Sequence, residues 1–385
     1  MLPDRPPIFH LNSSPTLGGA EVYTGFLAHA LQEGGWRNVI VTGRNASWWR
    51  DIQHGDIELR EHDFRVRDDI AGIPDDALIC VHAPLPKGLL DRLAARHRVL
   101  GLGHQAVYSS SIPYYYRAAH RLLPVSAHVA ATLRAAGFST VHETPLLGVA
   151  ELGRRDTGAG IRQGAMVEWD QRKTRDRLLA WGEPFIEWMM PRRIFAKRLG
   201  LTLGVVSRLA PLKQFPALFT ALMPALLRQP DVNLEVFGSA IGYRAYRELR
   251  RVLAPLGQRA RFWGFQSNVG AVYAELDYLL TGLPEREALG LNVIEAQQCG
   301  TPVLAPAAPP FTETMIDGVT GYLYADPRED RGAGFQSALE RARAMRPDPR
   351  FATEHLQRFS FAAFRARADA VFAAEAVQVA SSGHA

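Results

Sequence analysis

Short apolar runs alternate with amphipathic segments along this chain, and the alternation occurs twice. One series lies within residues 7–125 and the other within residues 202–305. Strand-length runs separated by helix-length segments are typical of parallel sheets, because parallel strands need long crossover connections. The sequence therefore predicts an α/β protein with two similar doubly wound units, each a parallel sheet with helices on both faces.

The expected elements follow this pattern. In the first series we expect strands at Pro7–Asn12, Asn38–Thr42, Ala77–Val81, Val99–Gly103 and Arg121–Val125, and a helix at Glu21–Gln32. In the second we expect strands at Thr202–Ser207, Asn233–Phe237, Ala260–Trp263, Tyr278–Thr281 and Pro302–Ala305, and helices at Pro216–Leu227, Tyr243–Leu256 and Leu291–Gln298. The pattern lapses at about residues 151–190, which we interpret as an insertion.

Composition narrows the classes of function. Of 385 residues, 47% are hydrophobic, which is enough for the cores of two or three domains. The formal net charge of +5 is compatible with binding to nucleic acid, to an anionic membrane or to an anionic substrate, and it does not distinguish among them. Only two cysteines occur, so a disulfide framework is excluded, and neither a signal peptide nor an apolar run of about 20 residues is evident. We expect a cytoplasmic protein.

Charged residues follow two strands of the second series. Arg208 and Lys213 follow the first of these strands, and Glu287 and Glu295 follow the fourth. Taken singly, each is the kind of charge that usually lies solvated at a surface. Ligands of open α/β sheets bind beyond the carboxyl ends of strands, and a helix is expected to begin near Gly290. Two cations and a helix N-terminus at one sheet edge indicate a diphosphate site.

Several stretches of the chain together resemble one known family. They are Val205–Lys213, Glu287–Val303, Glu313–Gly321 and Phe359–Phe361, and in the first half Leu17–Glu21, Gly103-His104, Val125-Ser126 and Leu147–Val149. The chain resembles the retaining glycosyltransferases of family four, whose GT-B fold has two Rossmann-like domains facing a central cleft. The second of these stretches holds the family signature, in which seven residues separate two glutamates. The resemblance covers nearly the whole chain except about residues 151–190.

The resemblance implies a role for each candidate residue. Arg208 and Lys213 would hold the donor phosphates, Glu295 the ribose hydroxyls and Glu287 the transferred sugar, with His104 near the reacting carbon. The implied catalytic residues are His104, Arg208, Lys213 and Glu287, and the implied donor-binding residues are Gly18, Gly19, Arg208, Lys213, Gly264, Glu287, Gly290, Leu291 and Glu295. The co-substrate would be a UDP- or GDP-sugar, the anomeric configuration would be retained, and neither a cofactor nor a metal ion would be required.

The resemblance also implies domain boundaries and partners. Residues 1–198, with the insertion at about 151–190, would form the acceptor-binding domain, completed by a C-terminal helix at 360–385. Residues 199–359 would form the donor-binding domain, and closure of the cleft would use hinges near Leu199-Gly200 and Phe359-Ser360. The acceptor would be a glycan, a lipid-linked molecule or a small molecule, of the kind used in polysaccharide or lipopolysaccharide biosynthesis.

Four departures from the family sequence leave the transferred sugar undefined. They are Ser207 and Gln214 in place of glycine, Ala288-Leu289 in place of Gly-Phe, and Pro309-Pro310 in place of a glycine pair. The last two border the expected sugar pocket. Two other functions stay open, because fold does not fix function: a nucleotide-sugar 2-epimerase and a non-catalytic sugar-nucleotide binder. Nucleic-acid binding is not expected, since no nucleic-acid-binding module is recognisable.

The insertion has a basic end. Residues 171–200 contain eight Lys or Arg and three acids, together with several aromatic and methionine residues. Such a segment is typical of a surface that docks on anionic lipid, and residues 171–198 would then place the protein peripherally on the inner face of the cell membrane. The alternative is a packed interdomain insert.

Overall fold

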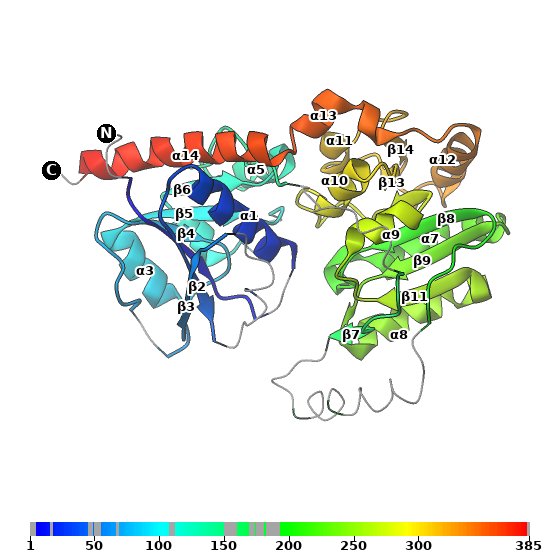
Figure 1. Cartoon of the computed structure of the whole chain (residues 1–385), viewed down its shortest axis with the longest axis horizontal. Coiled ribbons are helices and arrows are strands. Elements are labelled where there is room, and N and C mark those ends of the chain that lie inside the picture. The colour runs from blue at the N-terminus through cyan, green and yellow to red at the C-terminus, as the bar shows by residue number, and fades with distance from the viewer. Residues whose placement is uncertain are drawn as a thin grey trace. The chain divides into compact units, whose positions relative to one another are not determined.

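The computed structural model describes residues 5–15, 18–44, 49, 55–66, 69–107, 112–149, 160–168, 174, 181 and 193–382 (Figure 1). The chain divides into two compact units. The first unit consists of residues 1–149 and 357–385, and the second unit consists of residues 150–356. Of the helices within the described ranges, none is both long and apolar enough to cross a bilayer.

A six-stranded parallel sheet forms the centre of the first unit, with strand order β3-β2-β1-β4-β5-β6. Its strands are β1 (Ile8–Asn12), β2 (Asn38–Gly43), β3 (Glu58–His62), β4 (Leu78–Val81), β5 (Arg98–Gly103) and β6 (Arg121–Pro124). Its helices are α1 (Gly19–Glu33), α3 (Lys87–Arg96), α4 (Tyr114–Ala118), α5 (Ala127–Ala135) and α14 (Phe361–Ser382). The strand order reverses between β1 and β4, which makes their carboxyl ends the expected ligand position.

Helix α14 returns from the end of the chain to pack along α1 in the first unit (Figure 1). Its Asp369 carboxylate accepts a hydrogen bond from Trp36 Nε1 at 2.8 Å. Its buried Glu375 pairs with Arg98 at 2.5 Å and with Arg121 at 3.1 Å. Because these partners lie on or beside strands of the first sheet, the last helix belongs to that unit.

The second unit repeats the topology, with a parallel sheet in the order β11-β9-β8-β12-β13-β14. Its strands are β7 (Val167–Glu168), β8 (Leu201–Val206), β9 (Val232–Phe237), β10 (Ala240–Ile241), β11 (Ala260–Gly264), β12 (Tyr278–Leu280), β13 (Val303–Pro306) and β14 (Gly321–Tyr324), of which β7 and β10 form a separate pair. Its helices are α7 (Phe215–Leu227), α8 (Gly242–Leu253), α9 (Val269–Glu275), α10 (Leu291–Gln298), α11 (Phe311–Thr314), α12 (Ala333–Ala344) and α13 (Thr353–Gln357), with short 3₁₀ turns at Pro211–Lys213, Ala254–Arg259 and Pro349–Phe351. Here the order reverses between β8 and β12.

Alternating side chains of β8 enter two separate cores, one on each face of the second sheet. Leu203 and Val205 pack with apolar residues of α7, α8 and α12. Val206 packs with residues of α9, α10 and α11 on the opposite face. Both faces of the strand are therefore buried, which is why it reads as a continuous apolar run in the sequence.

The α/β prediction of two doubly wound units is confirmed, and each expected strand begins and ends within one residue of its expected bounds. Four strands, β3, β7, β10 and β14, were not expected from the sequence. Strand β3 lies at a sheet edge, where only His62 is fully buried, so its charged sequence Glu-Leu-Arg-Glu-His carries no apolar run. The helix expected to reach Leu256 ends at Leu253 and continues as a 3₁₀ turn.

The division between the units differs from the expected boundary at residues 198 and 199. The described residues 160–168 belong to the second unit, because β7 pairs with β10 and the Gly164 N–H donates to the Trp263 carbonyl at 2.7 Å. The Ala240 N–H likewise donates to the Met166 carbonyl at 2.9 Å. Backbone pairing, which composition does not reveal, attaches this part of the insertion to the second sheet.

Candidate functional site

The carboxyl ends of β8 and β12 carry the charged residues that sequence analysis selected. The loop after β8 begins with Ser207 and Arg208, and the chain after β12 leads to the start of α10. The Asn292 side-chain amide in the first turn of α10 donates to the Val206 carbonyl at the end of β8, at 3.1 Å. The two loops are thereby tied together at the switch point of the sheet, where open α/β proteins bind ligands.

Arg208 forms a bidentate ion pair with Glu168 of β7. Its Nε lies 3.1 and 3.0 Å from the two carboxylate oxygens, and its Nη2 lies 2.6 Å from Oε2. The Ser239 hydroxyl donates a further hydrogen bond of 2.6 Å to the same carboxylate. Glu168 therefore fixes the orientation of the Arg208 guanidinium, a role that sequence analysis did not assign to any residue of the insertion.

Lys213 pairs with Glu287, so the structure brings together two residues that lie 74 positions apart in the sequence. Both side chains are partly shielded, with 27% of the lysine and 15% of the glutamate exposed. The Glu287 Oε1 also accepts a hydrogen bond from the Ala288 N–H at 3.3 Å. An ammonium group and a carboxylate that neutralise each other can both turn to a ligand that offers an anion and hydroxyl groups.

Glu295 lies one turn into α10, where the Tyr273 hydroxyl donates to its Oε2 at 2.9 Å. Burial raises the pKa of the Glu295 carboxyl above its usual value, and the hydrogen bond from Tyr273 opposes that rise. Its two oxygens can accept hydrogen bonds from adjacent ligand hydroxyls, a geometry suited to a ribose.

The N-terminus of α10 begins at Leu291, with Gly290 as its N-cap at φ +80°. The first N–H groups of a helix have no acceptor within the helix, and the helix dipole adds positive potential there. This helix end carries Asn292, the residue tied to the end of β8. The arrangement thus places anion-binding N–H groups beside the loop that bears Arg208.

Gly264 lies at the end of β11, at the far side of β9 from β8. A Cβ atom there would lie 2.3 Å from the Gly164 carbonyl oxygen and 2.5 Å from that of Ala165. This glycine therefore permits a close approach of backbone from the insertion, which itself leads to Glu168. The resemblance implies that Gly264 binds the donor. The close approach of residues 164 and 165 is a separate, structural reason for a glycine at this position.

Gln214, which stands where the family has glycine, adopts a left-handed backbone conformation. This residue is at φ +54°, ψ +26°, between the 3₁₀ turn that ends at Lys213 and the start of α7. A left-handed conformation costs a glycine little and a glutamine more. The turn that presents Lys213 thus keeps the backbone shape that a glycine would favour, although the side chain is larger.

The remaining predicted residues, Gly18, Gly19 and His104, belong to the first unit. Gly18 is the N-cap of α1, which begins at Gly19 after β1. His104 follows β5, and its ring meets the Tyr23 ring of α1 edge-on at 5.1 Å between centroids. All three therefore lie at the carboxyl-end edge of the first sheet.

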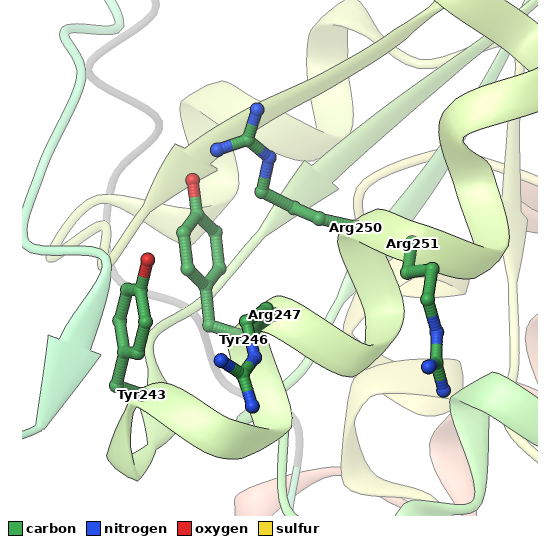
Figure 2. Close-up of a pocket in the computed structure, with 5 residues that line it drawn as sticks. All are labelled: Tyr243, Tyr246, Arg247, Arg250 and Arg251. Carbon is green, nitrogen blue, oxygen red and sulfur yellow. The ribbon is translucent and has the colours of Figure 1, made fainter.

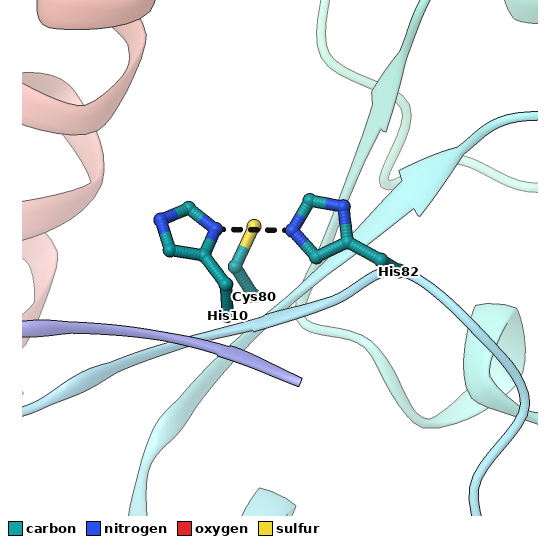
Figure 3. A group of neighbouring side chains, drawn as sticks. All are labelled: His10, Cys80 and His82. Atoms are coloured by element: carbon teal, nitrogen blue, oxygen red, sulfur yellow. Dashed lines mark hydrogen bonds between the residues drawn. The ribbon is translucent and has the colours of Figure 1, made fainter. Parts of the chain in front are cut away.

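Three histidines form a hydrogen-bonded row in the first unit. His10 Nδ1 lies 3.0 Å from His82 Nε2 (Figure 3). His82 Nδ1 lies 3.1 Å from His104 Nε2. Burial lowers the pKa of His10 to about 4 and that of His104 to about 3, and it lowers that of His82 well below its ordinary value. All three rings are therefore neutral at pH 7. Of the three, only His104 was expected from the sequence, because the family resemblance covers Gly103-His104 and gives no such indication for His10 or His82.

These pKa values predict that the protein loses stability as pH falls from 7 to 5. His10 takes up a proton near pH 4 when folded but near pH 6.5 when unfolded, so only the unfolded chain binds the proton in this window. The stability is fully present above pH 6.5, and at pH 5 the loss from this residue should be about 2 kcal/mol. Urea unfolding at pH 7, 6 and 5 measures it. The His10→Phe variant should show a shallower pH dependence, and an equal slope for both proteins would contradict the prediction.

Several surface depressions lie near α8, and one of 420 Å³ is lined by residues that include Arg193, Tyr246 and Arg261. Two others are smaller. One, of 340 Å³, adjoins the loop after Arg208 and is lined by residues that include Leu209, Pro211 and Arg244. The other has a volume of 260 Å³ and is lined by Tyr243, Tyr246, Arg247, Arg250 and Arg251 (Figure 2). Neither is lined by a residue that sequence analysis assigned to donor binding.

Comparison with known proteins identifies the second unit. Residues 200–341 match the sequence profile of the family described as glycosyl transferases group 1. A D-inositol 3-phosphate glycosyltransferase of Kribbella flavida is 29% identical over 187 residues, which cover 44% of this chain and 42% of that protein. The corresponding protein of Actinosynnema mirum is 34% identical over 156 residues, covering 38% of this chain and 37% of that protein. The chain thus spans about two fifths of the length of these curated relatives.

The likeness in fold extends over both units. The crystal structure of Anabaena HepE in complex with UDP and glucose aligns with a TM-score of 0.68 and 17% identity, covering 95% of this chain and 99% of that one. At this identity the alignment shows the shared fold alone. Residues 200–341 therefore match the family of glycosyl transferases group 1, and the chain has the GT-B fold.

Proposed function

We propose that this protein is a glycosyltransferase that moves a sugar from a nucleotide-diphosphate donor to an acceptor hydroxyl. The observation that carries the proposal is the convergence of Arg208, Lys213 and the N-terminus of α10 on the carboxyl ends of β8 and β12. Departure of a nucleotide diphosphate leaves negative charge on its terminal phosphate. Fixed cations and helix N–H groups stabilise such charge most where it develops.

In this proposal both cations exchange partners when the donor binds. Phosphate oxygens replace the Glu168 carboxylate beside Arg208 and the Glu287 carboxylate beside Lys213, because a diphosphate carries more charge than either acid. Glu287 is then free to accept hydrogen bonds from hydroxyls of the transferred sugar. Glu295, held by Tyr273, accepts hydrogen bonds from the ribose.

The donor is proposed to be a UDP- or GDP-sugar. HepE of Anabaena was crystallised with UDP and glucose, and a 30% identical relative in Corynebacterium glutamicum is named a GDP-mannose-dependent mannosyltransferase. We further propose that transfer retains the anomeric configuration, with a leaving phosphate oxygen taking the acceptor proton while the acceptor attacks from the same face. That step needs no pair of catalytic carboxylates. The acceptor is proposed to be a glycan, a glycolipid or a small molecule.

Transfer is also proposed to need no metal ion, since the cations of Arg208 and Lys213 and the α10 N-terminus stabilise the charge of the leaving diphosphate.

Release of nucleotide diphosphate from UDP- and GDP-sugars, with envelope glycolipid extract as acceptor, tests the function. We expect release that requires the extract and persists in EDTA. Strict dependence on added Mg²⁺ would contradict metal independence. Formation of a 2-epimer from UDP-N-acetylglucosamine alone would replace the transferase proposal with an epimerase.

Glu168 provides a sharper test of the exchange of partners. The Glu168→Gln variant keeps the side-chain shape but removes the charge that competes with phosphate for Arg208. We expect UDP or GDP to bind about 3- to 10-fold more tightly, a gain of about 1 kcal/mol for a partly exposed pair. Isothermal titration calorimetry measures the change. Glu248→Gln, which removes an exposed carboxylate from α8, controls for net charge. Unchanged or weaker binding by Glu168→Gln would contradict the exchange.

Peripheral membrane docking through residues 171–198 is a separate proposal. Most of this segment lies outside the described residues, including the basic positions Arg172, Lys173, Arg175 and Arg177. Its support is the basic and aromatic composition of the segment, together with the arginines and tyrosines of α8 shown in Figure 2. Co-sedimentation with anionic vesicles that is lost at high salt would support docking, and no sedimentation would refute it.

A further inference from the structure

The row of histidines in the first unit begins at a fixed acceptor. The Asn38 Nδ2 donates to the Trp36 carbonyl at 3.0 Å, so the side-chain oxygen of Asn38 is the atom that faces His10. That oxygen lies 3.1 Å from His10 Nε2 and can only accept a hydrogen bond. His10 therefore carries its proton on Nε2. Since the ring is neutral, His10 Nδ1 is an acceptor.

The tautomer of His10 determines the tautomer of His82. His82 Nε2 lies 3.0 Å from the accepting His10 Nδ1, so the proton of His82 is on Nε2 (Figure 3). His82 Nδ1 is then an acceptor. Each ring in the row thus determines which nitrogen of its neighbour carries the proton, because a neutral imidazole has one donor and one acceptor.

Two donors compete for His82 Nδ1. His104 Nε2 lies 3.1 Å away and the Thr24 hydroxyl 2.9 Å away. The Thr24 hydroxyl also lies 2.8 Å from the Ala20 carbonyl in the preceding turn of α1, an acceptor that can take its only proton. Whichever acceptor takes that proton, a lone pair on His104 Nε2 would face the lone pair of His82 Nδ1 at 3.1 Å, so His104 Nε2 is a donor. His104 then carries its proton on Nε2 as well.

We propose that His10 and His82 are positioning residues that hold the proton of His104 on Nε2, so that His104 Nδ1 accepts a hydrogen bond from a substrate hydroxyl. Within the described residues, Nδ1 of His104 has no hydrogen-bond partner, and the ring is half-buried. The atom accordingly has a lone pair to offer. The hydroxyl as partner rests on the proposed transferase function, whereas the position of the proton does not.

The neighbouring thiol of Cys80 suggests another use of this cluster. Its sulfur and the facing nitrogens of His10 and His82 all lie within 4.8 Å of one another (Figure 3). However, the two nitrogens are already joined by a 3.0 Å hydrogen bond, and burial raises the pKa of the thiol well above its ordinary value. The geometry therefore favours the row of hydrogen bonds over a cation.

Long-range ¹H–¹⁵N NMR of protein labelled at histidine reads the tautomer of each ring directly. In the wild type we expect the pattern of a neutral ring protonated on Nε2 for His10, His82 and His104 alike. The Thr24→Val variant removes the competing hydroxyl and should leave the His104 pattern unchanged. A wild-type His104 protonated on Nδ1 would overturn the proposal, as would a Thr24→Val variant in which the His104 tautomer changes.

A variant at the far end of the row tests the transmission. His10 is hydrogen-bonded to His82, which is hydrogen-bonded to His104, so His10→Phe should disturb the His104 tautomer through His82. We expect a mixture of both tautomers of His104 in this variant, with a transfer rate reduced about twofold or more because half of the molecules lack the acceptor at Nδ1. An unchanged His104 tautomer would refute transmission. Absence of transfer in the wild type as well as in both variants, with the expected spectra, would count against the transferase function alone.

Discussion

Replacing Arg208 or Lys213 by alanine should lower turnover by roughly 10²–10³-fold, equivalent to about 2.7–4 kcal/mol of transition-state stabilisation, without unfolding the protein. Each side chain supplies a cation to charge that develops on the leaving diphosphate. Both are partly exposed, at 24% and 27%, so neither change opens a core cavity. The rate of nucleotide-diphosphate release under donor saturation measures the effect.

Arg343→Ala is the matched control for this pair. Arg343 is a partly exposed arginine of the same unit that pairs with Asp231 at 2.6 Å, on α12 away from the loops after β8 and β12. Its loss should leave turnover within about twofold, since exposed ion pairs contribute little. An Arg208→Ala protein that is folded and turns over like this control would show that the guanidinium does not serve the leaving group.

A large effect on stability is expected at Gly264. The Gly264→Ala variant should lose about 3–5 kcal/mol, because its Cβ would meet two backbone carbonyl oxygens that cannot rotate away, and its φ of +68° is itself unfavourable for alanine. The segment that approaches Gly264 continues into Glu168. We therefore expect urea unfolding at a lower midpoint and weaker restraint on Arg208.

The Gly257→Ala variant separates the two causes of lost stability, which are the close backbone contact and the positive φ. Gly257 has a φ of +55°, and a Cβ there would have no heavy atom within 4 Å. Gly257→Ala should cost only the conformational part, about 1–3 kcal/mol, because φ +55°, ψ −127° is a conformation that alanine rarely adopts. Equal losses of stability in the two variants would mean that the close approach of residues 164 and 165 is unimportant.

Most of the strands that sequence predicts have both faces buried, although the half-buried β11 was predicted and the largely buried β14 was missed. Strands such as β1 and β8 appear as apolar runs, and their order along the chain indicates parallel sheets. The charged residues after β8 and β12 were identified for the same reason, since the ends of such runs mark the ligand-binding edge. Arg208 and Lys213 could thus be selected before any contact was known.

Residues whose role depends on partners far away in the sequence escaped prediction. Glu168 lies in a two-residue strand within an irregular segment, and only the pairing of β7 with β10 brings it to Arg208, 40 positions later. The same pairing moves the domain boundary. His10 and His82 likewise gave no signal, because a histidine within an apolar run does not reveal its neighbours in the next strand.

The central claim is that the second unit binds a nucleotide diphosphate through Arg208 and Lys213. Isothermal titration calorimetry of the whole protein with UDP, GDP, ADP and the corresponding monophosphates tests it most directly. We expect at least one diphosphate to bind more tightly than its monophosphate, with the dissociation constant rising about tenfold or more, or about 1.4 kcal/mol, in Arg208→Ala. Wild-type protein that binds none of the diphosphates, or an Arg208→Ala, Lys213→Ala double variant that binds them equally well, would contradict the claim.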